Sequence, residues 1–176
     1  MATRQVGPQN GTLVVNTYRA GIAQKIGHDL VIEVEQWDAT VDVGPEGTIQ
    51  SVRLDVDPRS LQVREGRNGV KPLTDKDLKD IRTSIGEKVL RGKPIAFASS
   101  GVVPRDGGAT IRGELTMADT TRPAAFDVDV SGDRHVAGTL VVTQSEWGIK
   151  PYKAMMGALK VRDDVEIVLD VRLPTA

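Results

Sequence analysis

Alternating apolar and polar residues dominate the sequence, most clearly between Thr110 and Val130. Residues 110–117 and 126–130 carry apolar side chains at every second position, with charged or hydroxyl side chains between them. A period of two is typical of antiparallel strands with one buried and one wet face. The polar stretch 118–123 lacks this pattern, and Pro123 cannot donate to a strand ladder. The segment is therefore predicted to be a hairpin, with Pro123 at the start of its second strand.

The same alternation predicts strands through most of the chain. Their ranges are 11–19, 29–43, 49–57, 94–103, 135–143 and 165–173. Within 29–43 the apolar residues change parity, so a bulge or bend near Glu35–Gln36 would turn both sets inward. Turn signals such as Asp106-Gly107-Gly108 join consecutive strands. We therefore expect a mainly β fold, a single up-and-down antiparallel β-barrel of about eight strands.

Three segments depart from the strand pattern. Residues 1–10 are interpreted as a flexible polar leader, and residues 59–71 as a polar connection. Thr74 with Asp77 resembles a capping box, and apolar residues follow at helical spacing. One amphipathic helix is thus predicted over residues 75–90, lying on the open end or flank of the sheet.

Composition narrows the classes of function. A chain of 176 residues with 39% hydrophobic content fits a single domain over residues 1–176. A net charge of -1 provides no bulk attraction to nucleic acid. The absence of cysteine excludes disulfides and thiol nucleophiles, and two histidines are too few for a His-cluster metal site. The sequence holds no nucleophile elbow, P-loop or dinucleotide fingerprint, so no cofactor is expected.

Location is predicted from the distribution of apolar residues. No run approaches the roughly 20 apolar residues that span a bilayer, and the first ten residues lack the apolar region of a secretory signal. We therefore expect a soluble, cytoplasmic protein.

Several segments, taken in order, resemble one protein family. They are GHDLV at 27–31, KPIAFAS at 93–99, GELTM at 113–117 with TRP at 121–123, SEWGI at 145–149, and the closing strand within 164–173. Over nearly its whole length the chain is similar to the YceI-like family. The resemblance implies a lipocalin-like barrel with a helix near its mouth, holding a long-chain isoprenoid, quinone or fatty amide. Members are often exported, and this chain departs from them in lacking a signal.

Residues that contact such a ligand are predicted from the inward positions and from one apolar loop. Core-facing residues are mostly small and aliphatic, and aromatic residues make up only 3% of the chain, which favours an internal cavity over a solid barrel. The loop 145–160 is too apolar for water, so it either lines the mouth or plugs one end. The predicted ligand contacts are Leu30, Ile32, Trp37, Ile81, Ile85, Phe97, Leu115, Phe126, Leu140, Trp147, Tyr152 and Met155.

No catalytic residue and no metal ligand is assigned. His28 adjoins Asp29, but neighbours on a strand point to opposite faces, so a structural histidine at a strand start is favoured. The pair Asp127 and Asp129, like Glu33 and Glu35, is interpreted as solubilising charge.

Three functions remain open. The leading hypothesis is a carrier of a long hydrophobic small molecule such as an isoprenoid, quinone or other lipid. A cyclase- or isomerase-type enzyme that uses the barrel as a chamber, with His28 and Tyr152 as its best residues, is the second. The third is a stress or interaction module with a solid barrel. For the carrier, a transient membrane contact for lipid exchange and a homodimer are further hypotheses.

Overall fold

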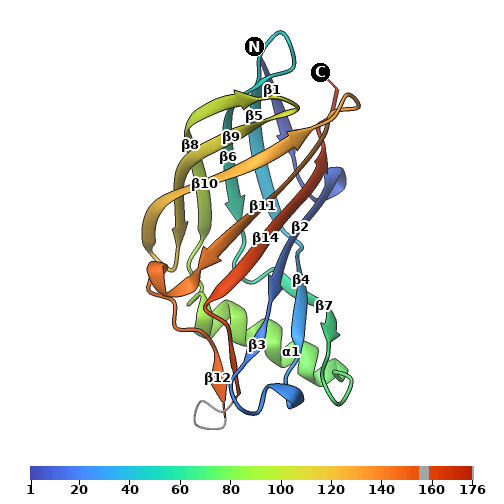
Figure 1. Cartoon of the computed structure of the whole chain (residues 1–176), viewed down its shortest axis with the longest axis vertical. Helices are drawn as coiled ribbons and strands as arrows, with labels where there is room; N and C mark the ends of the chain where they lie inside the picture. Colours follow the sequence, from blue (N-terminus) through green and yellow to red (C-terminus); the bar gives the residue numbers. More distant parts are fainter. Residues whose placement is uncertain (155–158, 176) are drawn as a thin grey trace.

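The computed structural model describes residues 1–154 and 159–175, and most of them lie in antiparallel strands (Figure 1). The large sheet has eleven strands in the order β1-β5-β6-β8-β9-β10-β11-β14-β2-β4-β7. Their bounds are β1 Ala2–Val6, β2 Gly11–Thr17, β4 Asp29–Val34, β5 Trp37–Val43, β6 Ile49–Val56, β7 Leu61–Arg67, β8 Ile95–Arg105, β9 Gly108–Met117, β10 Thr120–Val130, β11 His135–Thr143 and β14 Asp164–Arg172. A small sheet joins β12 (Lys153–Ala154), β13 (Leu159–Val161) and β3 (Arg19–Ala20).

The main sheet curls into a barrel, because the strand pairing that leads away from β2 on one side returns to it on the other. Strand β2 pairs with β14 on one side and with β4 on the other. Strand β4 continues into β5, which pairs with β6, and the ladder then runs through β8, β9, β10 and β11 back to β14. A barrel that closes in this way leaves few unpaired edges.

The strand count exceeds the predicted eight because the first three long strands are each broken. Residues 7–10 separate β1 from β2, residues 35–36 separate β4 from β5, and residues 57–60 separate β6 from β7. The second and third breaks lie side by side: Glu35 N donates to the Ser60 carbonyl at 2.8 Å, and Asp57 N to the Gln36 carbonyl at 3.0 Å. The predicted bend at Glu35–Gln36 is confirmed, because Val34 before it and Trp37 after it are both buried.

Two segments expected to be irregular are strands. The prediction of a flexible leader is wrong for Ala2–Val6, which form β1 and pair along their whole length with β5. The polar connection 59–71 contains β7, which pairs with β4. Each of these strands buries few side chains, so its apolar alternation is weak in the sequence. Backbone hydrogen bonds to the neighbouring strand, β5 for β1 and β4 for β7, hold it in the sheet.

The predicted hairpin forms with a tighter turn. Strands β9 and β10 are joined by Ala118 and Asp119, whose φ angles of 47° and 64° are typical of two-residue hairpin turns. Pro123 lies inside β10, not at its start, opposite Glu114. It is tolerated there because β10 pairs with β11 only at Val128–Val130, leaving the outer side of β10 without a ladder at Pro123.

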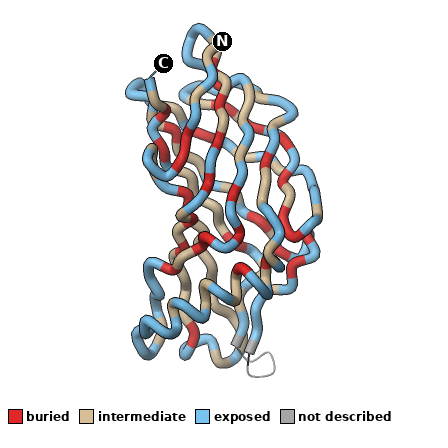
Figure 2. Tube along the Cα trace, turned by 180° about the vertical axis from the view of Figure 1, so that it is seen from behind, coloured by how far each residue is buried: buried red, intermediate tan, exposed pale blue. Residues whose placement is uncertain are grey.

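The helix follows its sequence pattern closely. Helix α1 spans Asp75–Ser84 and continues as one π-helical segment, η3 (Ile85–Val89). The capping box forms as predicted, with Asp77 N donating to Thr74 Oγ1 at 3.2 Å and Thr74 N to Asp77 Oδ2 at 2.9 Å. The helix crosses the end of the barrel opposite the two termini (Figure 1). Buried and exposed residues alternate along the strands, whereas the helix end is mostly half-buried or exposed (Figure 2).

Candidate functional site

The barrel interior is hollow. A cavity of about 500 Å³ runs along it, lined by residues from most strands of the barrel and from the helix. A single buried water needs only about 15 Å³ on this measure, and small-molecule sites typically measure about 300–1,000 Å³. Many lining residues, among them Val15, Leu54, Ile167 and Leu169, point inward yet are only half-buried. They keep accessible surface because no side chain fills the space in front of them.

Ten of the predicted contacts line this cavity. They are Leu30, Ile32, Trp37, Ile81, Ile85, Phe97, Leu115, Phe126, Leu140 and Tyr152. Most of the remaining wall, including Val15, Leu54, Ile167 and Leu169, is not among the predicted ligand contacts. Their signal was present, since each occupies an inward position in an alternating strand. Met155 lies outside the described residues.

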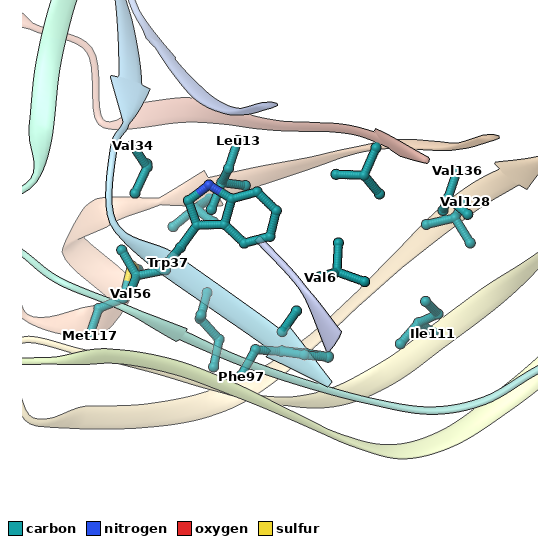
Figure 3. Packing of buried hydrophobic residues seen from close by; sticks show 14 of the residues in the cluster. Val6, Leu13, Val34, Trp37, Val56, Phe97, Ile111, Met117, Val128 and Val136 are labelled. Atoms are coloured by element: carbon teal, nitrogen blue, oxygen red, sulfur yellow. The ribbon is translucent and has the colours of Figure 1, made fainter. Parts of the chain in front are cut away.

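Both phenylalanines of the chain line the cavity. The rings of Phe97 and Phe126 lie 5.4 Å apart between centroids at an interplanar angle of 62°, an edge-to-face contact. They stand on β8 and β10, with β9 between them. Trp37 lies among Leu13, Val34 and Val56 (Figure 3).

Trp147 has another role than the one predicted. It is 4% exposed, does not line the cavity, and ends the short helix η4 (Gln144–Trp147). Its indole Nε1 donates to the Leu115 carbonyl at 2.8 Å. This hydrogen bond joins η4 to β9, and η4 also packs against β10. Ile149, two residues on, does line the cavity.

The cavity opens at the helix end. Among its lining residues, those classed as exposed are Ile26, Asp80, Tyr152 and Lys160. Ile26 belongs to the short helix η2 (Gln24–Ile26), Asp80 to α1 and Lys160 to β13. All these elements lie at the end opposite the termini (Figure 1). We call this opening the mouth.

A polar cluster fastens two loops at the mouth. Asp29 Oδ1 accepts from Arg19 N at 2.9 Å, and Asp29 Oδ2 accepts from Asn68 Nδ2 at 2.8 Å. The Arg19 guanidinium donates to the carbonyls of Gly27 and Asn68. Burial alone would raise the pKa of the Asp29 carboxyl, but these hydrogen bonds and the charge of Arg19 outweigh it and lower the pKa below 3.8.

His28 is held by the same pair of loops. Its Nε2 lies 2.6 Å from the Lys71 carbonyl oxygen, and Asp29 is occupied by Arg19 and Asn68. A Cβ at Gly69 would overlap the His28 ring, which explains glycine at that position. The interpretation of His28 as a structural histidine at a strand start agrees with these contacts.

Two buried polar atoms in the cavity wall have no hydrogen-bond partner among the described residues, namely Trp37 Nε1 and Thr17 Oγ1. An unsatisfied buried donor typically costs about 1–3 kcal/mol. They are exceptions in a wall that is otherwise mostly apolar.

Carboxylate pairs on the outer surface share an arginine as ion-pair partner. Arg105 reaches both Asp127 and Asp129, at 3.5 and 3.4 Å. Arg64 similarly joins Glu33 and Glu35. Within residues 1–154 and 159–175, no group of three or more His, Asp or Glu side chains could hold a metal ion.

Comparison with known proteins agrees with this architecture. A family model described as the YceI-like domain matches residues 12–173. The chain belongs to the YceI-like family. YceI-like proteins are known as lipid-binding barrels.

Solved structures of the same fold differ widely in sequence. BcnA of Burkholderia cenocepacia superposes with a TM-score of 0.67 at 16% identity, over 93% of this chain and 96% of that one. The YCEI protein of Campylobacter jejuni gives 0.59 at 11% identity, over 81% and 84%. At such identities only the fold is shared. No curated protein matches the sequence.

Proposed function

We propose that this YceI-like protein binds and carries a long hydrophobic small molecule, an isoprenoid, a quinone or a related lipid, inside its barrel. The observation that supports this most is the continuous cavity of about 500 Å³, because a buried aliphatic surface of that extent is costly to leave in contact with water. Transfer of a chain into it releases about 0.8 kcal/mol for each buried CH₂ group.

The polar groups favour an amphiphilic ligand. Charged lining residues are confined to the mouth and the helix beside it: Arg19, Asp80 and Lys160. A charged headgroup would therefore stay at the mouth, while deeper parts of the ligand carry at most neutral oxygens. The Trp37 indole N–H would donate to such an oxygen.

Solvent extraction of the purified protein, followed by mass spectrometry, tests the proposal. We expect a stoichiometric lipid, or stoichiometric uptake of quinones or isoprenoids by the stripped protein. Absence of both would overturn it.

The alternatives have weaker support. A solid-barrel module requires a filled interior, whereas the barrel is hollow. A chamber enzyme would depend on His28, which is bonded to a loop carbonyl, and on Tyr152 at the mouth. Turnover that is lost in His28→Ala or Tyr152→Phe while binding persists would favour the enzyme.

Two predictions about the cellular setting stay open. Among residues 1–154 and 159–175, no helix has the length and apolar character needed to cross a bilayer. The cytoplasmic location is tested by cell fractionation, and the homodimer by light scattering.

A further inference from the structure

The loops around the mouth expose large apolar side chains. Ile22 is 95% exposed, Val70 69%, Ile26 51% and Tyr152 49%. We call these four residues the apolar tips. They come from three separate segments, 20–28, 68–73 and 149–154, so their exposure is a shared property of this end of the barrel. Large exposed apolar side chains that gather in one place typically mark an interaction site.

Positive charge surrounds the apolar tips. The same segments and β13 carry Lys25, Lys71, Lys150, Lys153 and Lys160, all exposed, which we call the basic rim. Residues 20–28, 68–73, 149–154 and 159–162 contain no Asp or Glu. Asp80, the exposed carboxylate at the mouth, pairs with Lys76, and Lys93 pairs with Asp119, whereas no lysine of the basic rim has an ion-pair partner among the described residues. A chain of net charge -1 thus concentrates unpaired positive charge at its mouth.

Strand pairing and hydrogen bonds hold these segments together. Lys160 pairs with Ala20 across β13 and β3, and with Lys153 across β13 and β12. The loop 68–73 is joined to 27–28 by His28 at the Lys71 carbonyl and by Arg19 at Gly27 and Asn68. Ile26, Tyr152 and Lys160 themselves line the cavity. The apolar tips, the basic rim and the opening of the cavity therefore form one surface.

We propose that this surface docks the mouth onto the face of an anionic lipid bilayer. The apolar tips would insert among headgroups and upper acyl chains, where Tyr side chains are favoured. The basic rim would lie at the level of the lipid phosphates. Docked in this way, the cavity opens directly toward the lipid phase, and an apolar ligand moves between bilayer and barrel without crossing water.

A bilayer fits these features better than a protein partner does. Inserting isolated tips from three loops requires a soft partner and no shape complementarity. Lysine, unlike arginine, offers a point charge suited to many phosphate positions rather than to one fixed geometry. The choice of a membrane rests on the proposed function, since lipid transfer gives the mouth a reason to face a bilayer.

Co-sedimentation with lipid vesicles tests the docking. Stripped protein would be mixed with vesicles of phosphatidylcholine alone or of phosphatidylcholine with phosphatidylglycerol. We expect binding to the anionic vesicles only, weakened by added salt. Lys71→Gln with Lys153→Gln should reduce the affinity by roughly five-fold per lysine. Arg112→Gln with Arg122→Gln, the same charge change on exposed wall positions, should leave it unchanged.

The apolar tips are tested by a second matched pair. Ile22→Ser with Val70→Ser should weaken vesicle binding, while Val103→Ser with Val141→Ser, which also removes two exposed apolar residues, should not. No binding to anionic vesicles, equal losses in both members of either pair, or binding of an acidic protein but not of vesicles would overturn the proposal. Because stripped protein is used, vesicle binding does not depend on ligand binding. Extracted lipid without vesicle binding refutes the docking alone, whereas vesicle binding without any lipid uptake refutes the carrier.

Discussion

Removing the Ile85 side chain should loosen the helix over the mouth. Ile81 and Ile85 line the cavity, whereas Leu78 packs on the core without lining it. The other side of the helix is fixed: Arg82 binds the Gln62 side chain at 3.0 Å and the Arg59 carbonyl at 3.2 Å. If ligand passes through the mouth, the helix would swing away from the cavity about this fixed side.

The size of the effect follows from burial. Truncating a buried Ile to Ala costs about 2–5 kcal/mol, and Ile85 is half-buried, so we expect about 2 kcal/mol. In a domain of this size that lowers the melting temperature by roughly 4–8 °C. If the opening step breaks the Ile85 contacts, the rates of ligand uptake and release should both rise, by up to about 30-fold.

Stopped-flow measurement of the uptake and release rates of a fluorescent polyene shows whether the helix acts as a lid or Ile85 only contacts the ligand. Leu78→Ala, which does not line the cavity, should raise both rates and leave Kd unchanged. Val43→Ala, buried near the termini and outside the cavity wall, should lower stability without changing either rate. Faster release from Ile85→Ala with unchanged uptake would show that Ile85 is a ligand contact and that the helix is no lid.

Three further predictions test individual contacts. Trp147→Phe removes the hydrogen bond to the Leu115 carbonyl and should cost about 1–3 kcal/mol in denaturant unfolding, with ligand affinity unchanged; a large loss of affinity would contradict its place outside the cavity. The Asp29 cluster stabilises the mouth above pH 3.8 and loses this contribution as pH falls through the lowered pKa of Asp29. Amide exchange of residues 19–29 should therefore rise in the wild type as pH falls through that pKa. A rise of equal size in Asp29→Asn would refute the role of Asp29 ionisation. Trp37→Phe should weaken the binding of a quinone by roughly ten-fold relative to the binding of a hydrocarbon of equal length. An equal loss of affinity for both ligands would exclude the indole N–H as donor.

Much of the fold is predictable because one physical rule governs most of it. A strand between core and water must alternate, so β9, β10, β11 and β14 were all predicted with the correct inward face. The parity change at Glu35–Gln36 predicted the bend, since only a break could bury both Val34 and Trp37. The capping box and spacing of the helix were equally local signals.

The rest depends on contacts between distant segments. Only Val6 is fully buried in β1, and only Leu61 and Val63 in β7, so each is recognisable as a strand only from its partner. Trp147 was predicted as a ligand contact from an apolar loop, but its position depends on a hydrogen bond to Leu115, which lies on β9 and is distant in sequence. The basic rim was not foreseen, because its lysines come from segments far apart in sequence that the small sheet and the loop contacts bring together.

Two adjacent residues test whether the ligand occupies the inside of the barrel. Val15 faces the cavity, while Val14, on the same strand, is outside its lining. Titration of a fluorescent polyene into Val15→Trp and Val14→Trp, both checked for unchanged melting, is the most direct measurement. Val15→Trp should lose binding because the ring fills the cavity, and Val14→Trp should bind like the wild type. Equal binding by both variants would place the ligand elsewhere and contradict its location inside the barrel.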